Sequence, residues 1–461
     1  MRIPDGLLIQ YLTLLGWLFA IPWLVFLGRQ NRNISNKTYP KLAVFTSLQF
    51  LLQIMQIPLF GFPVALGVSA VPLTILSLGF RLGLFSTSAA LLLAAMLIPG
   101  YFGSFGINLL NVVFSSTIVL LPVRIRIKKK KSSRLRSLFV FFLSLFYYWT
   151  VGIMIAVELT FSHVFRNYVV AISFLAVVSI FGIAEGILSA FLFRVLASQD
   201  TSEYSLLVSP RTLPRALKDR YLKKLDLDPI GRYNRLDPRS KLITTGIFLI
   251  ALALSFEFYQ ELIIFLSAVF LFFIYRPSTR FFNRIAIAIP FTILLTGILL
   301  LGFQGQDVEQ AYKLGFRYFI SFVHSSLLLE SEESYFRYIE AMRELGIPKP
   351  IVTVLLISLR MANRLWEDFS SMKIAMVNRG AVLTLRLRGG WRSVLPIYMQ
   401  LFNNLLQKSL KYSEMISESL EERGFTGNLF FSVQPISSEG LTLQGLAFTI
   451  SLVTILSRFW I

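Results

Sequence analysis

The sequence predicts an all-α polytopic membrane protein with about 7 + 5 transmembrane helices and long cytoplasmic helices in its second half. Composition is the first reason, because 55% of the 461 residues are hydrophobic and only 15% are charged. The second reason is that apolar stretches long enough to cross a hydrocarbon core of about 30 Å recur along the chain. The chain contains no cysteine, which excludes disulfides and thiolate metal sites.

Residues 1–196 are expected to form a first membrane module of roughly seven spans. The expected spans are Leu7–Leu27, Leu42–Phe60, Pro63–Phe80, Leu84–Pro99, Phe105–Pro122, Leu138–Val157 and Val169–Phe193. An odd number of spans brings the chain, by Arg194, to the side of the membrane opposite its N-terminus.

The basic residues set the orientation of these spans. One side of the expected topology carries Arg29–Lys41, Arg81, Arg124–Arg136 and Arg194–Lys241. The other side carries Gly100–Gly103 and Glu158–Tyr168. By the positive-inside rule the N-terminus lies outside and the basic loops are cytoplasmic, in a multi-pass protein of the cell inner (plasma) membrane. Topology and anionic lipid headgroups then explain the net charge of +20, and no nucleic-acid partner is implied.

Residues 197–236 are expected to form a basic cytoplasmic linker, because they are polar, contain several prolines and lack a membrane-length apolar run. Residues 237–461 form the second module. Its spans are expected at Ile243–Glu257, Gln260–Tyr275, Ile285–Gly302, Tyr312–Leu329 and Leu441–Arg458. Before the last of these spans, the pattern changes to amphipathic helices that are longer than a span and too charged to cross lipid.

Local signals mark helix ends in the second module. Asp237-Pro238 is typical of a helix start, because Asp accepts from the first free N–H groups and Pro fits the first helical position. Farther along, Gly346 and Pro348 indicate that one helix ends and another begins.

Two Arg-Gly signatures close the long amphipathic helices. They are Asn378-Arg379-Gly380 and Glu422-Arg423-Gly424. An Arg at a helix end, followed by a helix-stopping Gly, suits docking into an acidic groove on another protein. Charge-assisted bonds from each Arg to a carboxylate are worth about 1.5–3 kcal/mol. Two such ends predict two docking partners or one symmetric pair.

The second module resembles CbiQ, the transmembrane coupling subunit of energy-coupling-factor transporters. The resemblance covers about Leu225–Ile461 and rests on the Arg-Leu-Asp-Pro-Arg-Ser-Lys opening at Arg235–Lys241, the hinge at Ala341–Pro348 and the two Arg-Gly ends. It implies that two ABC-type ATPase subunits, or a homodimer, each receive one Arg-Gly end. ATP is then used by those partners, with no cofactor in this chain. The family signature is usually Ala-Arg-Gly, whereas Asn378 and Glu422 stand first here.

The first module resembles CbiM, the cobalt- or nickel-binding subunit of the same transporters. The opening Met1–Gly6 is similar to the family's Met-His-Ile-Pro-Asp-Gly, and segments at Phe62–Ala65, Gly103–Asn111 and Gly182–Glu185 fit later family segments. The resemblance implies a nitrogen-rich metal site that includes the second-residue His and a later His. Here the second residue is Arg2, and Phe62–Leu73 contains no His. A permanently charged guanidinium has no lone pair for a metal, so we expect the usual site to be absent.

These departures suggest an anion-binding centre in place of the metal. The substrate would be a small carboxylated or phosphorylated metabolite, or a preformed anionic metal chelate. The residues expected around it are Met1, Arg2, Asp5, Asn108, Asn111 and Glu185. Glu185 lies in an apolar span, where carboxylates are usually functional. Two plainer interpretations are an Arg2–Glu185 pair that neutralises the site and helix–helix hydrogen bonds by the asparagines. His163 and His324 are expected not to be ligands.

The sequence predicts a transporter subunit and not an enzyme. It contains no phosphate-binding loop, no Gly-x-Ser-x-Gly elbow and no His-Glu-x-x-His motif. We expect a fused substrate-binding and coupling subunit of an energy-coupling-factor importer. The alternatives are a cobalt or nickel importer with a non-standard site built from backbone groups and Asp5, a non-transporting membrane anchor for ATPases, and a lipid-modifying enzyme. The last would need paired carboxylates that face one cavity.

Overall fold

The computed structural model describes residues 2–5, 7–8, 10–32, 34–35, 38–54, 57–58, 65–67, 69–98, 101–121, 133–162, 164, 168–199, 237–255, 257–275, 279–302, 308–329, 335–378, 390–422 and 438–456. Most of the expected linker, and residues 122–132 within the expected basic run, lie outside the described residues. The described part of the chain is almost entirely helical.

The first module contains seven described helices and one short pair of strands. Its elements are α1 (Gln10–Gln30), α2 (Thr38–Ile54), β1 (Ile57–Pro58), β2 (Ala65–Leu66), α3 (Val71–Leu78), α4 (Phe80–Leu97), α5 (Phe105–Leu120), α6 (Ser133–Phe161) and α7 (Tyr168–Gln199). The strands pair antiparallel, with Ile57 opposite Leu66.

The second module is helical throughout its described residues. Its elements are α9 (Pro238–Leu254), α10 (Phe258–Tyr275), α11 (Thr279–Gly302), α12 (Val308–Leu329), α13 (Tyr335–Glu344), α14 (Lys349–Asn378), α15 (Gly390–Glu422) and α16 (Ser438–Leu456). Both local helix signals are confirmed. The Asp237 carboxylate accepts from the backbone N–H of Arg239 at 2.9 Å, and Gly346 has φ +88°, a value that suits glycine.

The chain is a helical membrane protein. Among the described residues, four helical segments are long and apolar enough to cross a bilayer, namely Tyr11–Gln30, Phe80–Leu97, Ser137–Phe161 and Val169–Arg194. Within the apolar segment of each helix, 78% of the residues are buried in α4, against 22% in α1 and 28% in α7. α4 is therefore the central helix, while α1 and α7 present most of their apolar surface outward. The count of 7 + 5 spans, and the orientation derived from it, stay predictions.

The expectation of a span at Pro63–Phe80 is wrong. This segment contains β2 and then α3, which has only 8 residues and rises about 12 Å, far less than a hydrocarbon core. Two local features break the apolar run. Pro72 lies in the first turn of α3, and Gly79, with φ +83°, separates α3 from α4. Hydropathy averages over such breaks, so it does not detect them.

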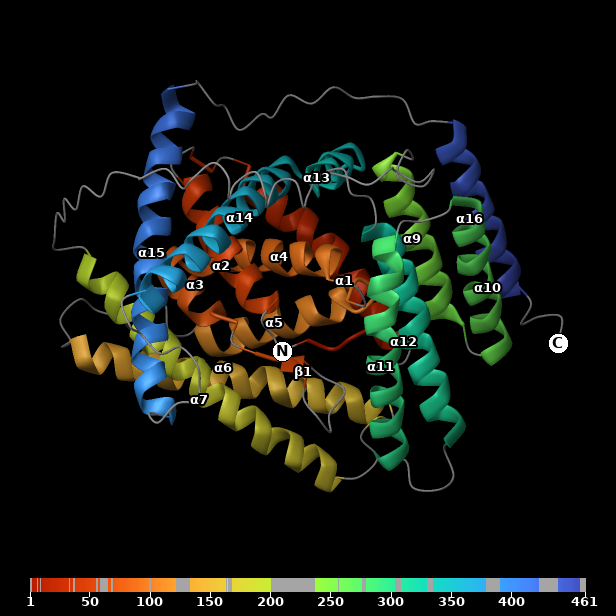
Figure 1. The fold of residues 1–461 in the computed structure, drawn as a ribbon, viewed down its shortest axis with the longest axis horizontal. Helices are drawn as coiled ribbons and strands as arrows, with labels where there is room; N and C mark the ends of the chain where they lie inside the picture. The colour runs from red at the N-terminus through yellow and green to blue at the C-terminus, as the bar shows by residue number, and fades with distance from the viewer. Residues whose placement is uncertain are drawn as a thin grey trace.

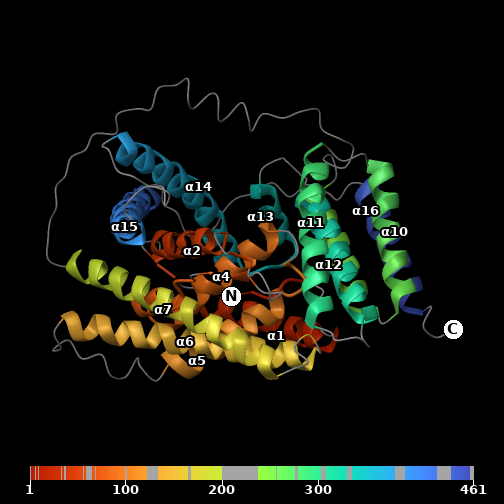
Figure 2. The same ribbon diagram turned by 60° about the horizontal axis from the view of Figure 1, so that its bottom comes forward.

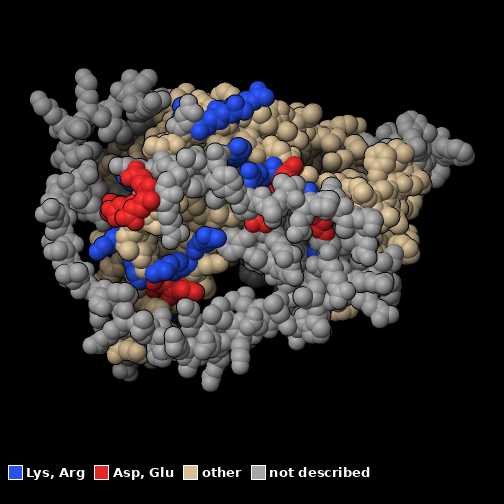
Figure 3. All heavy atoms as spheres, turned by 90° about the horizontal axis from the view of Figure 1, so that it is seen from above, with Lys and Arg blue, Asp and Glu red and all other residues tan. Residues whose placement is uncertain are grey.

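The helices of the two modules run in different directions. In both ribbon views α6 follows the long axis of the molecule, whereas α10, α11 and α12 run across it (Figures 1 and 2). The end of the molecule where α13, α14 and the last turns of α15 lie carries groups of both basic and acidic side chains (Figure 3). This charged face is consistent with the amphipathic character expected of these helices.

The two modules share one continuous core. The first half of α14 is buried against α2, and the Ser47 hydroxyl of α2 donates to the carbonyl oxygen of Ser358 in α14 at 2.7 Å. Leu406 of α15 packs in a cluster with Leu48, Leu73 and Leu192 of the first module. A movement of α14 or α15 therefore acts directly on the helices of the first module.

Candidate functional site

Residues 2–5 are a segment without helix that is buried inside the first module. We call residues 2–5 the N-terminal arm; Ile3 is fully buried, and Arg2 and Asp5 are each 3% exposed. The Asn108 amide clamps the backbone of Ile3, because its Oδ1 accepts from the N–H at 2.9 Å and its Nδ2 donates to the carbonyl at 3.0 Å. The Ser104 hydroxyl donates to the same carbonyl at 2.6 Å. These bonds satisfy polar groups of the arm that are buried away from water.

Asp5 fixes the other end of this clamp. Its carboxylate accepts from the backbone N–H groups of Gly103 at 2.9 Å and Ser104 at 2.6 Å, just before α5 begins at Phe105. A carboxylate at this position also interacts favourably with the positive end of the helix dipole. Gly103 leaves little room for a side chain, since a Cβ atom there would lie 3.2 Å from Cγ of Asp5. The arm is thus held to α5 by both its backbone and its carboxylate.

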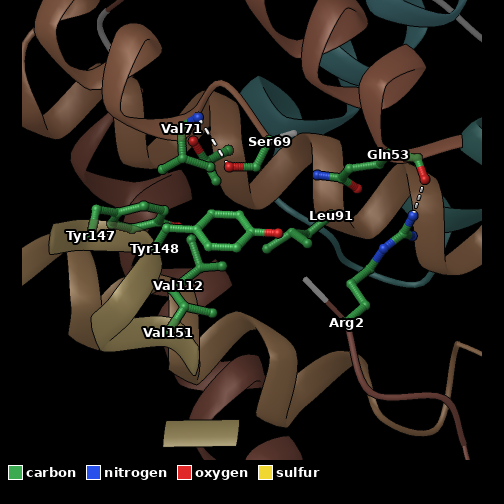
Figure 4. Close-up of a pocket in the computed structure, with 10 residues that line it drawn as sticks. Arg2, Gln53, Ser69, Val71, Leu91, Val112, Tyr147, Tyr148 and Val151 are labelled. Carbon is green, nitrogen blue, oxygen red and sulfur yellow. Dashed lines mark hydrogen bonds between the residues drawn. The ribbon is translucent and has the colours of Figure 1, made fainter. Parts of the chain in front are cut away.

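Arg2 lines a small cavity whose walls are partly polar and mostly apolar (Figure 4). The cavity has a volume of about 20 Å³, which is room for about one water molecule. Its polar lining comes from Arg2, Gln53, Ser69, Thr87, Tyr147 and Tyr148. The tyrosines lie on one side, and Arg2 with Gln53 on the other (Figure 4). The guanidinium donates to the carbonyl oxygen of Gln53 and lies 4.8 Å from the ring centroid of Tyr101.

Glu185 supports a strained turn on the cavity wall. Its Oε2 accepts from the backbone N–H of Ser69 at 2.6 Å, and its side chain is fully buried. The next residue, Ala70, has φ +53°, a left-handed conformation that costs a non-glycine residue about 1–2 kcal/mol. Tyr148 holds the same turn from α6, because its hydroxyl donates to the carbonyl of Gly67 at 3.1 Å. Glu185 therefore orients Ser69, which lines the cavity.

The expected substrate residues fall into three groups. Arg2 lines the cavity, and Asp5 and Asn108 hold the arm that carries it. Glu185 supports the Ser69 turn. Asn111 instead donates to the buried carboxylate of Glu158 at 2.8 Å, a helix–helix bond between α5 and α6. Met1 lies outside the described residues.

Sequence reasoning missed most of the cavity wall. Ser69 falls within Phe62–Leu73, where the family resemblance places a histidine, and this placement is the one signal in the sequence that points to its position. Gln53, Tyr147 and Tyr148 carried no such signal, because nothing local distinguishes them from other polar or aromatic residues in spans.

Histidines and carboxylates do not form a metal-type cluster in the described part of the chain. No group of three or more His, Cys, Asp or Glu side chains there is close enough to hold an ion. His324 is buried in α12, and its ring stacks on Phe248 with centroids 4.6 Å apart. His163 lies outside the described residues.

The second part of the candidate site is the pair of long helices α14 and α15. From Ser370 to Asn378, which the structure describes throughout, no side chain of α14 is buried, so the last turns of the helix project from the body. Asn378 and Glu422 are exposed at the ends of the two helices. The residues that follow them, Arg379, Gly380, Arg423 and Gly424, lie outside the described residues.

A polar contact joins α14 to α15 where they cross. Lys408 Nζ lies 2.5 Å from Asp368 Oδ1, and the Arg364 guanidinium lies 4.7 Å from the ring centroid of Tyr412. Burial lowers the pKa of Lys408, the hydrogen bond to Asp368 raises it, and the net direction is upward. The hydrogen bond from Arg364 to the Tyr412 hydroxyl likewise raises the pKa of Arg364. Both cations thus stay charged at neutral pH.

The fold and the site together define a helical membrane protein, with a small cavity in one module and long projecting helices in the other. The CbiM family model, described as a cobalt uptake substrate-specific transmembrane region, matches residues 2–202. The CbiQ family model, described as a cobalt transport protein, matches residues 232–433. The chain is therefore a CbiM region fused to a CbiQ region, the architecture of a CbiMQ-type energy-coupling-factor transporter. These families are transporter components and not enzymes.

Solved structures add a weak likeness. A chain titled as a transition metal transporter is 19% identical, with a TM-score of 0.38, over 44% of this chain and 95% of that chain. A truncated transition metal transporter is also 19% identical, with a TM-score of 0.37, over 43% of this chain and 99% of that chain. No curated protein sequence matches the chain.

Proposed function

We propose that this chain is the membrane component of an ATP-driven importer of the energy-coupling-factor type. It binds a small substrate in the first module and couples to separate ABC-type ATPases through the second. The observation that best supports this is the two-part character of α14. Its first half is buried against α2 of the first module, while its last turns project and end beside an Arg-Gly signature.

The relative direction of the two helix sets supports a reorientation mechanism. Helix α6 runs along the molecule and α10 to α12 run across it (Figures 1 and 2), so α6 and this second set do not both cross a bilayer along its normal in this arrangement. A first module that turns relative to the second exposes its cavity to one side of the membrane and then to the other. Because α14 and α15 pack on α2, their movement is the natural cause of the turn.

The substrate class follows from the charge at the cavity. The guanidinium of Arg2 is permanently cationic and has only donors, so it favours a carboxylate or phosphate group and repels a bare metal cation. The cavity, at about 20 Å³, admits only a small group, so a larger substrate must open it. A small anionic metabolite, or an anionic metal chelate, satisfies the charge requirement.

A cobalt or nickel importer with a non-standard site is the second candidate, because the CbiM model describes cobalt uptake. That site would need Asp5 as a ligand. The Asp5 carboxylate already accepts three hydrogen bonds, from Gly103, Ser104 and Ser321, which leaves it poorly available to a metal. This observation favours the anionic substrate. A non-transporting anchor for ATPases is the third candidate.

Mass spectrometry of the purified protein separates these functions. The full chain is purified in gentle detergent, and elemental and organic mass spectrometry are applied to wild type and to Arg2→Ala. A stoichiometric organic anion that is absent from the variant supports the proposal. Stoichiometric nickel or cobalt in both proteins refutes the anionic substrate and favours metal import. If the protein is empty, substrate-stimulated ATP hydrolysis by the co-purified ATPases separates weak binding from the anchor role.

A further inference from the structure

The N-terminal arm contacts both modules of the chain. Arg2 lines the cavity of the first module, and Asp5 accepts a hydrogen bond from the Ser321 hydroxyl of α12 in the second module at 2.8 Å. Both Arg2 and Asp5 are buried, and Ser321 is fully buried. Residues 2–5 therefore connect the cavity to the second module directly.

The arm is held firmly enough to transmit a displacement. Both polar groups of the Ile3 backbone are bonded to Asn108, and the Asp5 carboxylate is bonded to the backbone of Gly103 and Ser104. If Arg2 moved and the rest of the arm did not follow, the Ile3 backbone or the Asp5 carboxylate would have to break a buried hydrogen bond. The displacement is passed instead to the next contact, which is Asp5 with Ser321.

On the receiving side, α12 is anchored within the second module. Arg317, one turn before Ser321, donates from Nε to the Glu261 carboxylate of α10 at 2.9 Å and from a terminal nitrogen to the carbonyl of Ser255 at 3.1 Å. Glu261 is fully buried. A displacement of Ser321 would therefore also strain the bonds that join α12 to α10 and to the end of α9.

The contact between arm and α12 is not tightly filled. A cavity of about 30 Å³, room for about two water molecules, lies beside it. Its lining includes Asp5 and Ser104 from the first module and Arg317 and Ser321 from the second. A polar contact with adjacent free volume can change its geometry without creating a steric clash, in contrast to a close-packed apolar interface.

We propose that the N-terminal arm transmits the state of the substrate cavity to α12, and that Ser321 is the positioning residue of the second module that receives it. This inference rests on the proposed function for its purpose, since a coupled transporter needs its second module to respond to the first. The coupling between Arg2 and α12 through Asp5 and Ser321 is inferred from the contacts alone.

A hydrogen-exchange cycle on the full chain in lipid nanodiscs tests it, without substrate or ATPase. Exchange of α12 amides is measured in wild type, Arg2→Ala, Ser321→Ala and the double variant. Arg2→Ala is expected to speed exchange around Ser321 by roughly threefold, and to have almost no further effect in the Ser321→Ala background. If Arg2→Ala does not fold, Arg2→Gln, which keeps an N–H donor on a shorter and uncharged side chain, takes its place.

Two variants distinguish transmission from a merely structural effect. Ser326→Ala removes another fully buried hydroxyl of α12, one with no hydrogen-bond partner among the described residues. In that background the effect of the Arg2 substitution should persist, and Ser321→Thr, which keeps a hydroxyl, should also preserve it. An equal effect of the Arg2 substitution in the Ser321→Ala and Ser326→Ala backgrounds overturns the inference. Because no substrate is involved, failure of the mass spectrometry experiment is a separate result.

Discussion

Glu185 offers the sharpest test of how the cavity wall is built. Its substitution by Ala leaves the buried N–H of Ser69 without its 2.6 Å acceptor, which costs about 1–3 kcal/mol. The neighbouring Ala70 has a strained backbone conformation, with φ +53°, and this bond helps to maintain it. With a central value of about 2 kcal/mol, and a tenfold change for each 1.4 kcal/mol, local opening of the turn becomes roughly 30-fold easier. Glu185→Gln keeps an acceptor oxygen and should change opening by less than about fivefold.

Hydrogen exchange of residues 69–78 in the full chain measures this opening directly. The reasoning predicts fast exchange in Glu185→Ala and near wild-type exchange in Glu185→Gln. Equal exchange in both variants, or no change in either, would refute the assignment of Glu185 as the support of Ser69. A direct substrate contact gives a different pattern, because the Gln variant then loses bound substrate while its exchange stays normal.

Three further predictions concern the long helices and the membrane core. The double substitution Arg379→Ala and Arg423→Ala should weaken ATPase capture by at least roughly 100-fold, since two charge-assisted bonds are lost, as measured by co-purification and quantitative mass spectrometry. Gly106→Ala should destabilise the protein by about 1–3 kcal/mol, because a Cβ there meets the backbone of α1, whereas Gly246→Ala has open space; thermal unfolding followed by tryptophan fluorescence compares them. Lys408→Met should weaken the α14–α15 crossing by only about 0.2–1 kcal/mol, because the side chain is 40% exposed, as read from exchange of α15 amides.

Each of these predictions has a control or a contrary outcome. For ATPase capture, Lys373→Ala removes a charge from the exposed part of α14 and should leave capture unchanged; equal loss in both proteins would indicate non-specific electrostatics. Equal destabilisation by the two glycine substitutions would mean that the contact between α1 and α5 is not close. Because the folded-state pKa of Lys408 is raised, its stabilising effect is fully present below the ordinary lysine pKa and is lost as pH rises through the folded value. Loss of the Lys408 contact near neutral pH would contradict its assignment.

Local chemistry was predictable from short stretches of sequence. The cap at Asp237 and the helix end at Gly346 depend only on residues within one turn, and the structure confirms both. The change from spans to amphipathic helices after α12 was also visible, because the period of hydrophobic residues survives in any helix packed on one face. In contrast, the apolar run 63–80 was misinterpreted, because mean hydropathy does not register a strand pair or a glycine break within it.

By itself, the sequence determined the class of protein, the two family regions and the presence of Arg2 where the family resemblance places a histidine. These properties depend on composition, on motif order and on the identity of single residues. Tertiary structure alone decided where Arg2 points and what surrounds it. Gln53, Ser69 and Tyr148 meet at the cavity from distant positions, and the bond from Ser321 to Asp5 spans 316 positions in the chain. No local pattern encodes such contacts, because they arise only when helices pack and buried polar groups find partners across the core.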